Sequence, residues 1–347
     1  MLSVFKKERK KMKKSWLMKT GCALAMALTV AGCGSAGEND DSGLTTVKVM
    51  LDYTPNTNHT GLYVAQNQGY FQEQGLNVEI IEPGDNATTS MVAAGKADFG
   101  VSYQEDVTYA LTSEDPLPIK TVAAVVQHNT SGFVALASAG IESVKDFEGK
   151  TYAGWGAPSE EAVIHAVMNE AGADFDKLTM VGSDGSGIAG LSDEVGTNKV
   201  NLGWEFYGWA VIQAKRAGYD VKYIPLNELD RRLDYYTPVI ITNDDMISND
   251  PETVKKFMAA TKKGYEYAID HPKEAARILY EDALPDADLE FLEESQEYLS
   301  SEYAKDASSW GVMKDSVWDD YTEFMYECGL IDHTIPASDQ YTNEFVE

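Results

Sequence analysis

The sequence has few cysteines and no long apolar run. Its 347 residues include only three cysteines, at positions 22, 33 and 328. The apolar run from Cys22 to Cys33 is shorter than the roughly 20 residues that a membrane-spanning helix needs. A nucleophile elbow, a P-loop, a paired-cysteine metal site and a His-Glu-x-x-His motif are also missing. These absences argue against a permanent transmembrane anchor and against the hydrolase, nucleotide and zinc sites that such motifs mark.

Basic residues are scarce as well. Lys and Arg number 28 against 56 Asp and Glu, a net charge of −28. Residues 1–32 hold eight of the basic residues and one acidic residue, so their removal leaves a net charge of −35. A field of this sign repels phosphate backbones, which argues against nucleic-acid binding and favours a neutral or cationic ligand over an anionic one. Solubility alone would also explain the acidic excess.

The N-terminus predicts export. Eight basic residues precede the apolar run, the pattern of a secretory signal peptide over residues 1–32. Val30-Ala31-Gly32-Cys33 resembles a bacterial lipobox, which implies that Cys33 is lipidated and becomes the N-terminus of a protein held on the extracytoplasmic face of the cell membrane. Residues 33–44 are small and polar and predict a flexible tether. Cys328 shares helical spacing with Tyr321 and Phe324, so we expect it to be a small buried hydrophobe.

From Thr45 onward, β-rich runs alternate with amphipathic segments. This pattern predicts an α/β protein with mainly parallel sheets. We expect strands at 47–51, 77–81, 97–102, 119–126, 151–154, 179–182, 200–204 and 221–225. We expect helices at 61–68, 88–94 and 163–171, and a helical C-terminal cap with helices from Pro251 to Pro272 and at 274–281, 288–300 and 312–328.

Two segments predict crossings between lobes, His128–Phe133 and Asp234–Val239. If both are hinges, residues 45–132 with 239–347 form one lobe and residues 133–238 form the other, with hinge segments near 128–133 and 234–239. Two α/β lobes joined by two hinge crossings are the type II periplasmic-binding-protein architecture, which closes around a ligand.

The segment Asp52–Ala65 is the first with clear functional character. A predicted strand ends at Asp52, a turn rich in Asn, Thr and Pro follows, and a helix begins near Thr60. Ligands of α/β proteins lie at strand C-termini, where helix N-termini offer free N–H groups. We therefore expect Tyr53, Asn58 and His59 to face a crevice, although packing of Tyr53, capping by Asn58 and a satisfied buried His59 are alternatives.

The same segment carries a family resemblance. Together with Gly69-Tyr70-Phe71, Ala94–Gly100, Gln127–Gly132, Trp155-Gly156 and Gly203–Glu205 it resembles the thiamine-pyrimidine family over most of the mature chain. Bacterial members bind formylaminopyrimidine or hydroxymethylpyrimidine for import, and fungal members synthesise the pyrimidine phosphate. The resemblance implies an extracytoplasmic solute-binding protein of an ABC importer, partnered by a membrane permease. We expect it to act as a monomer, with no cofactor and no metal.

The resemblance also separates receptor from enzyme. In the fungal synthases the strand that falls here at 97–102 ends with a cofactor-binding lysine, and four residues further on lies a histidine consumed as substrate. Those positions are Ser102 and Asp106 in this chain, and the cysteine-rich iron-binding motif of the synthases has no counterpart. Without these groups the chain lacks the residues that the pyrimidine synthesis requires, so we expect no catalytic residues.

What remains is recognition chemistry that suits an aminopyrimidine. Aromatic faces stack on a flat ring, and carboxylates or amides accept its N–H groups. Glu205 is the strongest single candidate, although it could instead offset a helix dipole. The other candidates are Asp52, Tyr53, Asn58, His59, Tyr103, Gln104, Glu105, His128, Trp155, Glu160, Trp204, Phe206, Tyr207, Tyr235 and Tyr236.

Two further points leave the ligand open. Riboflavin or a sulfonate is an alternative ligand for the same receptor, although a sulfonate would require a basic residue in the pocket. Phe206 and Tyr207 leave the pocket size undetermined, and Trp209 is expected in the core.

Overall fold

The computed structural model describes residues 43–84, 87–196 and 199–346. The predicted signal peptide and Cys33 lie outside these residues. Among the residues described, no helix is both long and apolar enough to cross a membrane.

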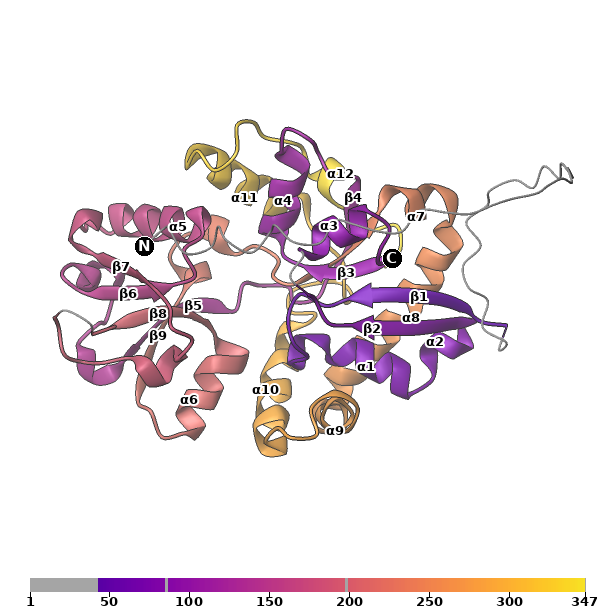
Figure 1. The fold of residues 1–347 in the computed structure, drawn as a ribbon, viewed down its shortest axis with the longest axis horizontal. Coiled ribbons are helices and arrows are strands. Elements are labelled where there is room, and N and C mark those ends of the chain that lie inside the picture. Colours follow the sequence, from indigo (N-terminus) through magenta and orange to yellow (C-terminus); the bar gives the residue numbers. More distant parts are fainter. Residues whose placement is uncertain (1–42, 85–86, 197–198, 347) are drawn as a thin grey trace, which may run out of the picture. The chain divides into compact units, whose positions relative to one another are not determined.

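Two five-stranded sheets form the centres of two α/β lobes (Figure 1). The first sheet has the order β2-β1-β3-β10-β4 and the second has the order β7-β6-β8-β5-β9. The strands of the first are β1 (Thr45–Met50), β2 (Leu76–Ile81), β3 (Phe99–Ser102), β4 (Ile119–Ala124) and β10 (Val239–Asn243). Those of the second are β5 (Ser131–Leu136), β6 (Thr151–Gly154), β7 (Thr179–Gly182), β8 (Leu202–Phe206) and β9 (Val221–Pro225).

Both sheets are mixed, whereas the sequence predicted mainly parallel sheets. In the first sheet β10 runs antiparallel to its neighbours β3 and β4, and in the second β5 runs antiparallel to β8 and β9. The register explains the direction: Val239 at the start of β10 pairs with Ser102 at the end of β3, and Ser131 at the start of β5 pairs with Phe206 at the end of β8. Each of these strands follows a crossing segment and therefore enters its sheet at the edge where the parallel strands end.

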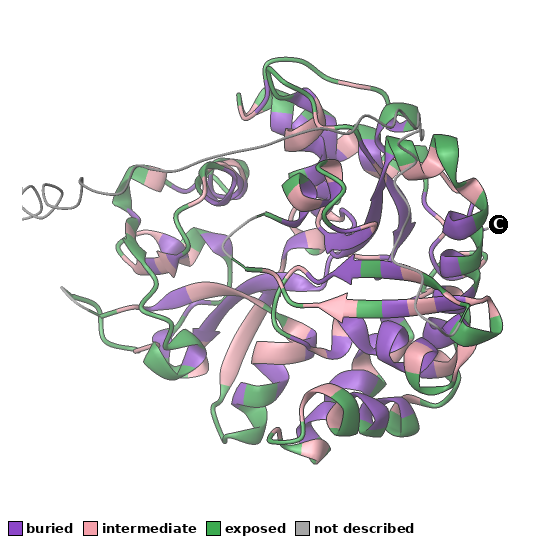
Figure 2. Cartoon of the chain, turned by 45° about the vertical axis from the view of Figure 1, so that its right-hand side comes forward, coloured by how far each residue is buried: buried purple, intermediate pink, exposed green. Residues whose placement is uncertain are grey.

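Helices cover both sheets, and their exposed faces contrast with the buried central strands (Figure 2). Those of the first 225 residues are α1 (Thr60–Asn67), α2 (Tyr70–Glu73), α3 (Thr88–Ala93), α4 (Gln104–Thr112), α5 (Pro158–Glu170) and α6 (Ile212–Arg216). After β10 follow α7 (Asp244–Asn249), α8 (Pro251–Asp270), α9 (Pro272–Ala283), α10 (Leu289–Glu302), α11 (Asp315–Glu327) and α12 (Ala337–Gln340). The prolines at 251 and 272 each open a helix, because the first helical position needs no N–H donor.

Helix α1 begins within the segment Asp52–Ala65 and is fixed by close packing on α8. A side chain at Gly264 would place its Cβ 2.0 Å from the carbonyl oxygen of Gly61, and one at Gly61 would meet the ring of Tyr265 at 2.3 Å. The Tyr265 hydroxyl donates a hydrogen bond to the Asn58 carbonyl at 2.7 Å. The glycines thus allow the helices to approach, and this contact sets the position of the turn before α1.

The chain passes between the two sheets twice, after β4 and after β9, and the two crossing segments are hydrogen-bonded to each other. Asp234 in the second crossing accepts hydrogen bonds from the Asn129 backbone at 2.9 Å and pairs with His128 Nδ1 at 2.7 Å. This bond raises the pKa of His128 above its ordinary value, against the opposite effect of burial. His128 therefore joins the two crossings.

The C-terminal helices pack against both lobes. Trp318 of α11 lies in a hydrophobic cluster with Ile241 of the first sheet, whereas Tyr321 and Phe324 of the same helix lie in a cluster with Phe133 of the second sheet. Phe291 of α10 also packs with Ile212 of α6. The segment after residue 243 therefore contributes to both cores rather than to one lobe alone.

Candidate functional site

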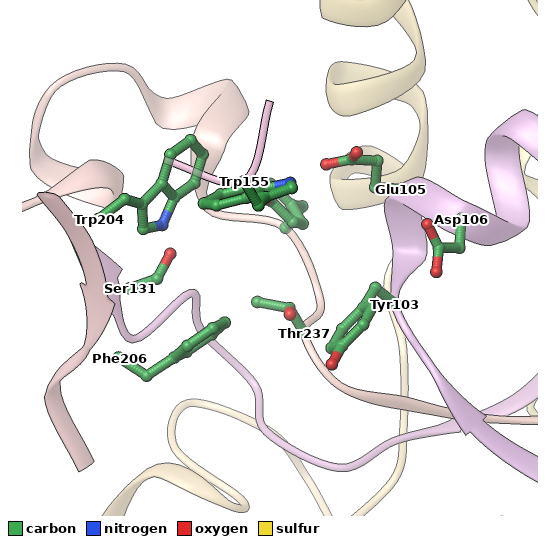
Figure 3. A pocket seen from close by; sticks show the side chains of 9 residues that line it. Tyr103, Glu105, Asp106, Ser131, Trp155, Trp204, Phe206 and Thr237 are labelled. Atoms are coloured by element: carbon green, nitrogen blue, oxygen red, sulfur yellow. The ribbon is translucent and has the colours of Figure 1, made fainter. Parts of the chain in front are cut away.

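A cleft between the two lobes opens at the edge where the parallel strands of both sheets end. Its first cavity, drawn in Figure 3, has a volume of about 280 Å³. Residues from both lobes and both crossings line it: Tyr103, Glu105, Asp106, Ser131, Trp155, Trp204, Phe206, Tyr235 and Thr237. The sheet topology thus brings together side chains that lie up to 134 positions apart in the sequence, from Tyr103 to Thr237.

Two further cavities adjoin the first, because they share lining residues with it. The second cavity, of about 270 Å³, shares Tyr103 and Phe206 with the first and is also lined by Asp52, Tyr53, Thr54, Asn56, Asn58, Glu205, Trp209, Ala210 and Pro238. The third cavity, of about 430 Å³, shares Tyr103 and Asp106 with the first and extends along the first lobe past Asp52 and Glu82. Tyr103 borders all three cavities and therefore lies at their junction.

Aromatic rings make up much of the first cavity. Trp155 and Trp204 meet edge to face with their ring centres 5.2 Å apart, and Tyr235 stacks on Tyr321 at 4.0 Å. Trp155 is 60% exposed and Phe206 is 37% exposed. Large aromatic side chains left open inside a concave surface are typical of a place where a ligand binds.

The short loop that carries Trp155 is held by a buried carboxylate. Glu160, fully buried at the start of α5, accepts hydrogen bonds from the Tyr152 hydroxyl at 2.5 Å and from the Trp155 and Gly156 backbone N–H groups at 3.2 and 2.7 Å. Its oxygens are therefore occupied by the protein itself. Glu160 positions Trp155 and does not reach the cleft.

A second network holds Tyr103. His59 Nδ1 accepts a hydrogen bond from the Asn56 backbone at 3.1 Å, so Nε2 carries the proton that it donates to Asp52 Oδ1 at 2.6 Å. The Tyr103 hydroxyl donates to Asp52 Oδ2, also at 2.6 Å. Burial works to raise the pKa of Asp52, but the interactions with His59 and Tyr103 outweigh it and hold the pKa below its usual value. Asp52 is therefore an ionised acceptor that fixes the Tyr103 ring at the junction of the cavities.

Three further carboxylates, Glu105, Asp106 and Glu205, border the first two cavities. Burial raises the pKa of Glu105, which also accepts a hydrogen bond from Tyr321 at 3.1 Å. Asp106 is an exposed residue of the open cleft. The protein around it partly desolvates its carboxylate, and this effect and the nearby charges of Glu105 and Asp52 raise its pKa to about 6. Burial alone raises the pKa of Glu205, and no residue in the described part of the chain donates a hydrogen bond to its carboxylate.

The structure brings most of the predicted site residues together. Ten line the cleft: Asp52, Tyr53, Asn58, Tyr103, Glu105, Trp155, Trp204, Glu205, Phe206 and Tyr235. Glu205 lies within the last part of β8 and not, as expected, at the start of a helix, because β8 ends two residues later than predicted. The helix-dipole alternative for Glu205 therefore loses its basis.

The other six predicted residues do not line the three cavities and have partners within the protein. His59 and Glu160 are occupied by the networks described above, and His128 pairs with Asp234. Buried Gln104 bonds to the Tyr236 backbone at 2.9 Å, and the Tyr236 hydroxyl accepts from the Lys314 backbone at 3.0 Å. Tyr207 packs on Tyr223 and Tyr298. These six support the cleft or the core.

Sequence reasoning missed several lining residues. Ser131 and Thr237 lie at the two crossings and carry no pattern that distinguishes them from other small polar residues. Asn56, not Asn58, caps the turn before α1, and it too lines the cleft. Trp209, expected in the core, packs on Phe291 but also lines the second cavity. A π-helix over Tyr207–Val211 replaces the expected α-helical spacing there, and such turns often lie at functional sites.

No metal centre is evident in the described ranges, where no group of three His, Cys, Asp or Glu side chains is placed to hold an ion. Cys328 is partly buried against the second lobe's core, and burial raises its pKa. Neither feature contributes to the cleft.

Two mixed α/β sheets with a cleft at their facing edges define the periplasmic-binding-protein fold. The alkanesulfonate-binding protein SsuA from Xanthomonas axonopodis pv. citri, solved with bound MOPS, has this fold with a TM-score of 0.63 and 11% identity, over 86% of this chain and 98% of that one. Within that class, the chain belongs to the NMT1/THI5-like family, whose model matches residues 56–275.

Of two curated relatives, one is named as a binding protein and the other as an enzyme. A formylaminopyrimidine-binding protein from Halalkalibacterium halodurans is 33% identical over 263 residues, which cover 74% of this chain and 76% of that protein. A 4-amino-5-hydroxymethyl-2-methylpyrimidine phosphate synthase from Legionella pneumophila is 23% identical over 86% of this chain and 92% of the synthase. Membership of the family therefore leaves both a receptor and an enzyme to be considered.

Proposed function

We propose that this protein is a solute-binding receptor of an ABC importer, which captures a thiamine pyrimidine precursor between its two lobes and performs no reaction on it. The observation that carries the proposal is the cleft itself. Aromatic faces from both lobes line it, and the Glu205 carboxylate borders it without a protein partner. A partly buried carboxylate without a partner carries a desolvation cost, and a ligand that donates N–H groups would compensate that cost.

An aminopyrimidine fits the chemistry of this cleft. Its flat ring can stack on aromatic faces, and its amino group can donate to Glu205. Tyr103 and Phe206 border both the first and the second cavity, so a ring between them would have Glu205 on one side and the tryptophans on the other. The relative that is named for formylaminopyrimidine binding supports this ligand class.

An enzymatic role is the weaker candidate, although a synthase is among the relatives. The position implied for a cofactor-binding lysine is Ser102, a buried residue at the end of β3, and a hydroxyl cannot form a Schiff base. The position implied for the histidine consumed as substrate is Asp106. The residues present therefore do not fit the cofactor of that synthesis.

In the cell, the receptor would be held on the outer face of the membrane by a lipid on Cys33 and would present its ligand-bound form to a permease. We infer that the crossings near 128–133 and 234–239 act as hinges between lobes of residues 45–132 with 239–347 and 133–238. The bond between His128 and Asp234 would make the two crossings bend together. Closure would follow from a higher affinity of the closed form for ligand.

Mass spectrometry of small molecules released from the purified protein tests the proposal, with calorimetric titration of each compound found. A thiamine pyrimidine bound in a 1:1 ratio is the expected result. A flavin or a sulfonate would contradict the ligand class and leave the receptor intact. Conversion of a pyrimidine by the protein would contradict the receptor.

A further inference from the structure

The charged side chains around the cleft are of one sign. Among the described residues that line its three cavities, the charged ones are Asp52, Glu82, Glu105, Asp106 and Glu205, with no Lys, Arg or His. The described arginines nearest in sequence to the cleft strands are engaged elsewhere: Arg216 pairs with Asp288, and Arg232 pairs with Asp230 and Glu327. An anionic ligand would therefore enter this cleft without a cationic partner.

The five carboxylates differ in what they contact. Asp52 is held by His59 and Tyr103, and Glu105 accepts from Tyr321. Asp106 lies one residue further along α4 and borders the first and third cavities. In the described part of the chain neither an ion pair nor a hydrogen bond to the Asp106 carboxylate is found. Glu82 is exposed and borders only the third cavity, away from the tryptophans. Asp106 in the first lobe and Glu205 in the second are thus the two carboxylates of the first two cavities that are left for a ligand.

The first cavity combines the Asp106 carboxylate with aromatic faces. Figure 3 shows Glu105 and Asp106 on one side of the cavity and Trp204 and Phe206 on the other, with Trp155 between them. Indole and phenol rings attract cations through the negative charge density of their faces, and desolvation strengthens that attraction. An aromatic cavity with a carboxylate edge is chemistry that recognises a positive group.

We propose that the ligand is an aminopyrimidine that carries a positive charge on its substituent, with the charged group in the first cavity beside Asp106 and the ring amine at Glu205. This inference rests on the proposed function and names its ligand more closely. The relevant class is a pyrimidine with an ammonium group, such as an aminomethyl substituent, in place of a neutral hydroxymethyl one. Tyr103 and Phe206, which border both cavities, would flank the ring.

Two compounds that differ in one group provide the test. The ammonium form of 4-amino-5-aminomethyl-2-methylpyrimidine and neutral 4-amino-5-hydroxymethyl-2-methylpyrimidine share the ring, and each is titrated into the purified protein by calorimetry near neutral pH. We expect the ammonium compound to bind about tenfold more tightly or better, as for a hydrogen bond between charged partners. Equal affinities, or tighter binding of the neutral compound, would overturn the inference and leave the proposed function standing. Formylaminopyrimidine is titrated as a third compound, and binding of none of the three would reject the proposed function as well.

Asp106→Asn tests the role of the residue, with Asp115→Asn as the control for loss of one exposed charge on the same lobe. We expect Asp106→Asn to remove most of the preference for the ammonium compound and to leave the affinity for the neutral one nearly unchanged, whereas Asp115→Asn keeps both. A preference that persists in Asp106→Asn would overturn the assignment. Because the two ligands are compared within one variant, a partial loss of folded protein changes both titrations equally and does not imitate the effect.

Discussion

Glu205→Gln should weaken ligand binding without weakening the fold. The substitution keeps the shape of the side chain and removes its charge. In the free protein the carboxylate has no partner among the described residues, and burial raises its pKa, so the folded state holds the charged form at a cost. Loss of that charge should leave the free energy of unfolding unchanged or increased.

The effect on binding should have the opposite sign. Each hydrogen bond from a ligand N–H to the charged carboxylate contributes about 1.5 to 3 kcal/mol, whereas Gln keeps only one, uncharged, acceptor oxygen and has an NH2 donor in place of the other. We therefore expect the dissociation constant for an aminopyrimidine to rise about 10- to 150-fold. Calorimetry measures the affinity and thermal unfolding measures the stability, with Glu170→Gln on an exposed part of the same lobe as the matched control. Unchanged affinity in Glu205→Gln would refute the reasoning, and so would an equal loss in the control.

Three further predictions follow from contacts in the structure. Gly264→Ala should lower the free energy of unfolding by about 1 to 3 kcal/mol in denaturant titration, because its Cβ would lie 2.0 Å from the Gly61 carbonyl, whereas Lys256→Ala on the exposed face of α8 should change it little. Glu160→Ala should lower the free energy of unfolding by about 3 kcal/mol or more in the same titration, because it leaves one hydroxyl and two backbone N–H groups without their acceptor. A decrease below about 1 kcal/mol would show that other contacts hold the loop. The affinity for the ammonium compound should fall as the pH drops through about 6, where Asp106 becomes protonated and neutral, and Asp106→Asn should reduce that dependence in calorimetry across the pH range to the part that comes from Glu205, whose pKa burial also raises.

The turn and helix around Asp52–Ala65 could be predicted from the sequence because their determinants are local. Asn and Pro set the turn, and the helix begins at Thr60 as expected to within one residue. The same holds for the strands at 151–154, 179–182 and 221–225, whose predicted bounds agree with the structure. Short runs of β-branched and aromatic residues bounded by glycine or polar residues determine these elements without distant partners.

The start of strand β5 could not be predicted from the residues of the segment alone. The segment His128–Phe133 was predicted as a crossing, yet β5 begins at Ser131 and pairs with β8 and β9 on either side. Ser131, Gly132 and the residues after them form a strand because two neighbours supply the hydrogen bonds, and pairing over this sequence distance is not encoded within the segment itself. The mixed direction of both sheets has the same origin.

Some residues of the candidate site could likewise be predicted from the local sequence and others could not. Residue type and position at a strand end were enough to predict Trp155, Trp204 and Glu205, which line the cleft. They were not enough for His59 and Gln104, which lie at similar places but face partners contributed by other segments. Whether a polar side chain at a strand end faces a ligand or the protein depends on those distant partners, which the local sequence does not specify.

One measurement tests most directly whether the protein binds its ligand and leaves it unchanged. The purified protein is titrated by calorimetry with 4-amino-5-hydroxymethyl-2-methylpyrimidine, its aminomethyl counterpart and formylaminopyrimidine, and the recovered compounds are identified by mass spectrometry. Saturable 1:1 binding of at least one of them and recovery of that compound unchanged are the expected results. Binding of none of the three, or recovery of a converted product, would contradict capture without a reaction.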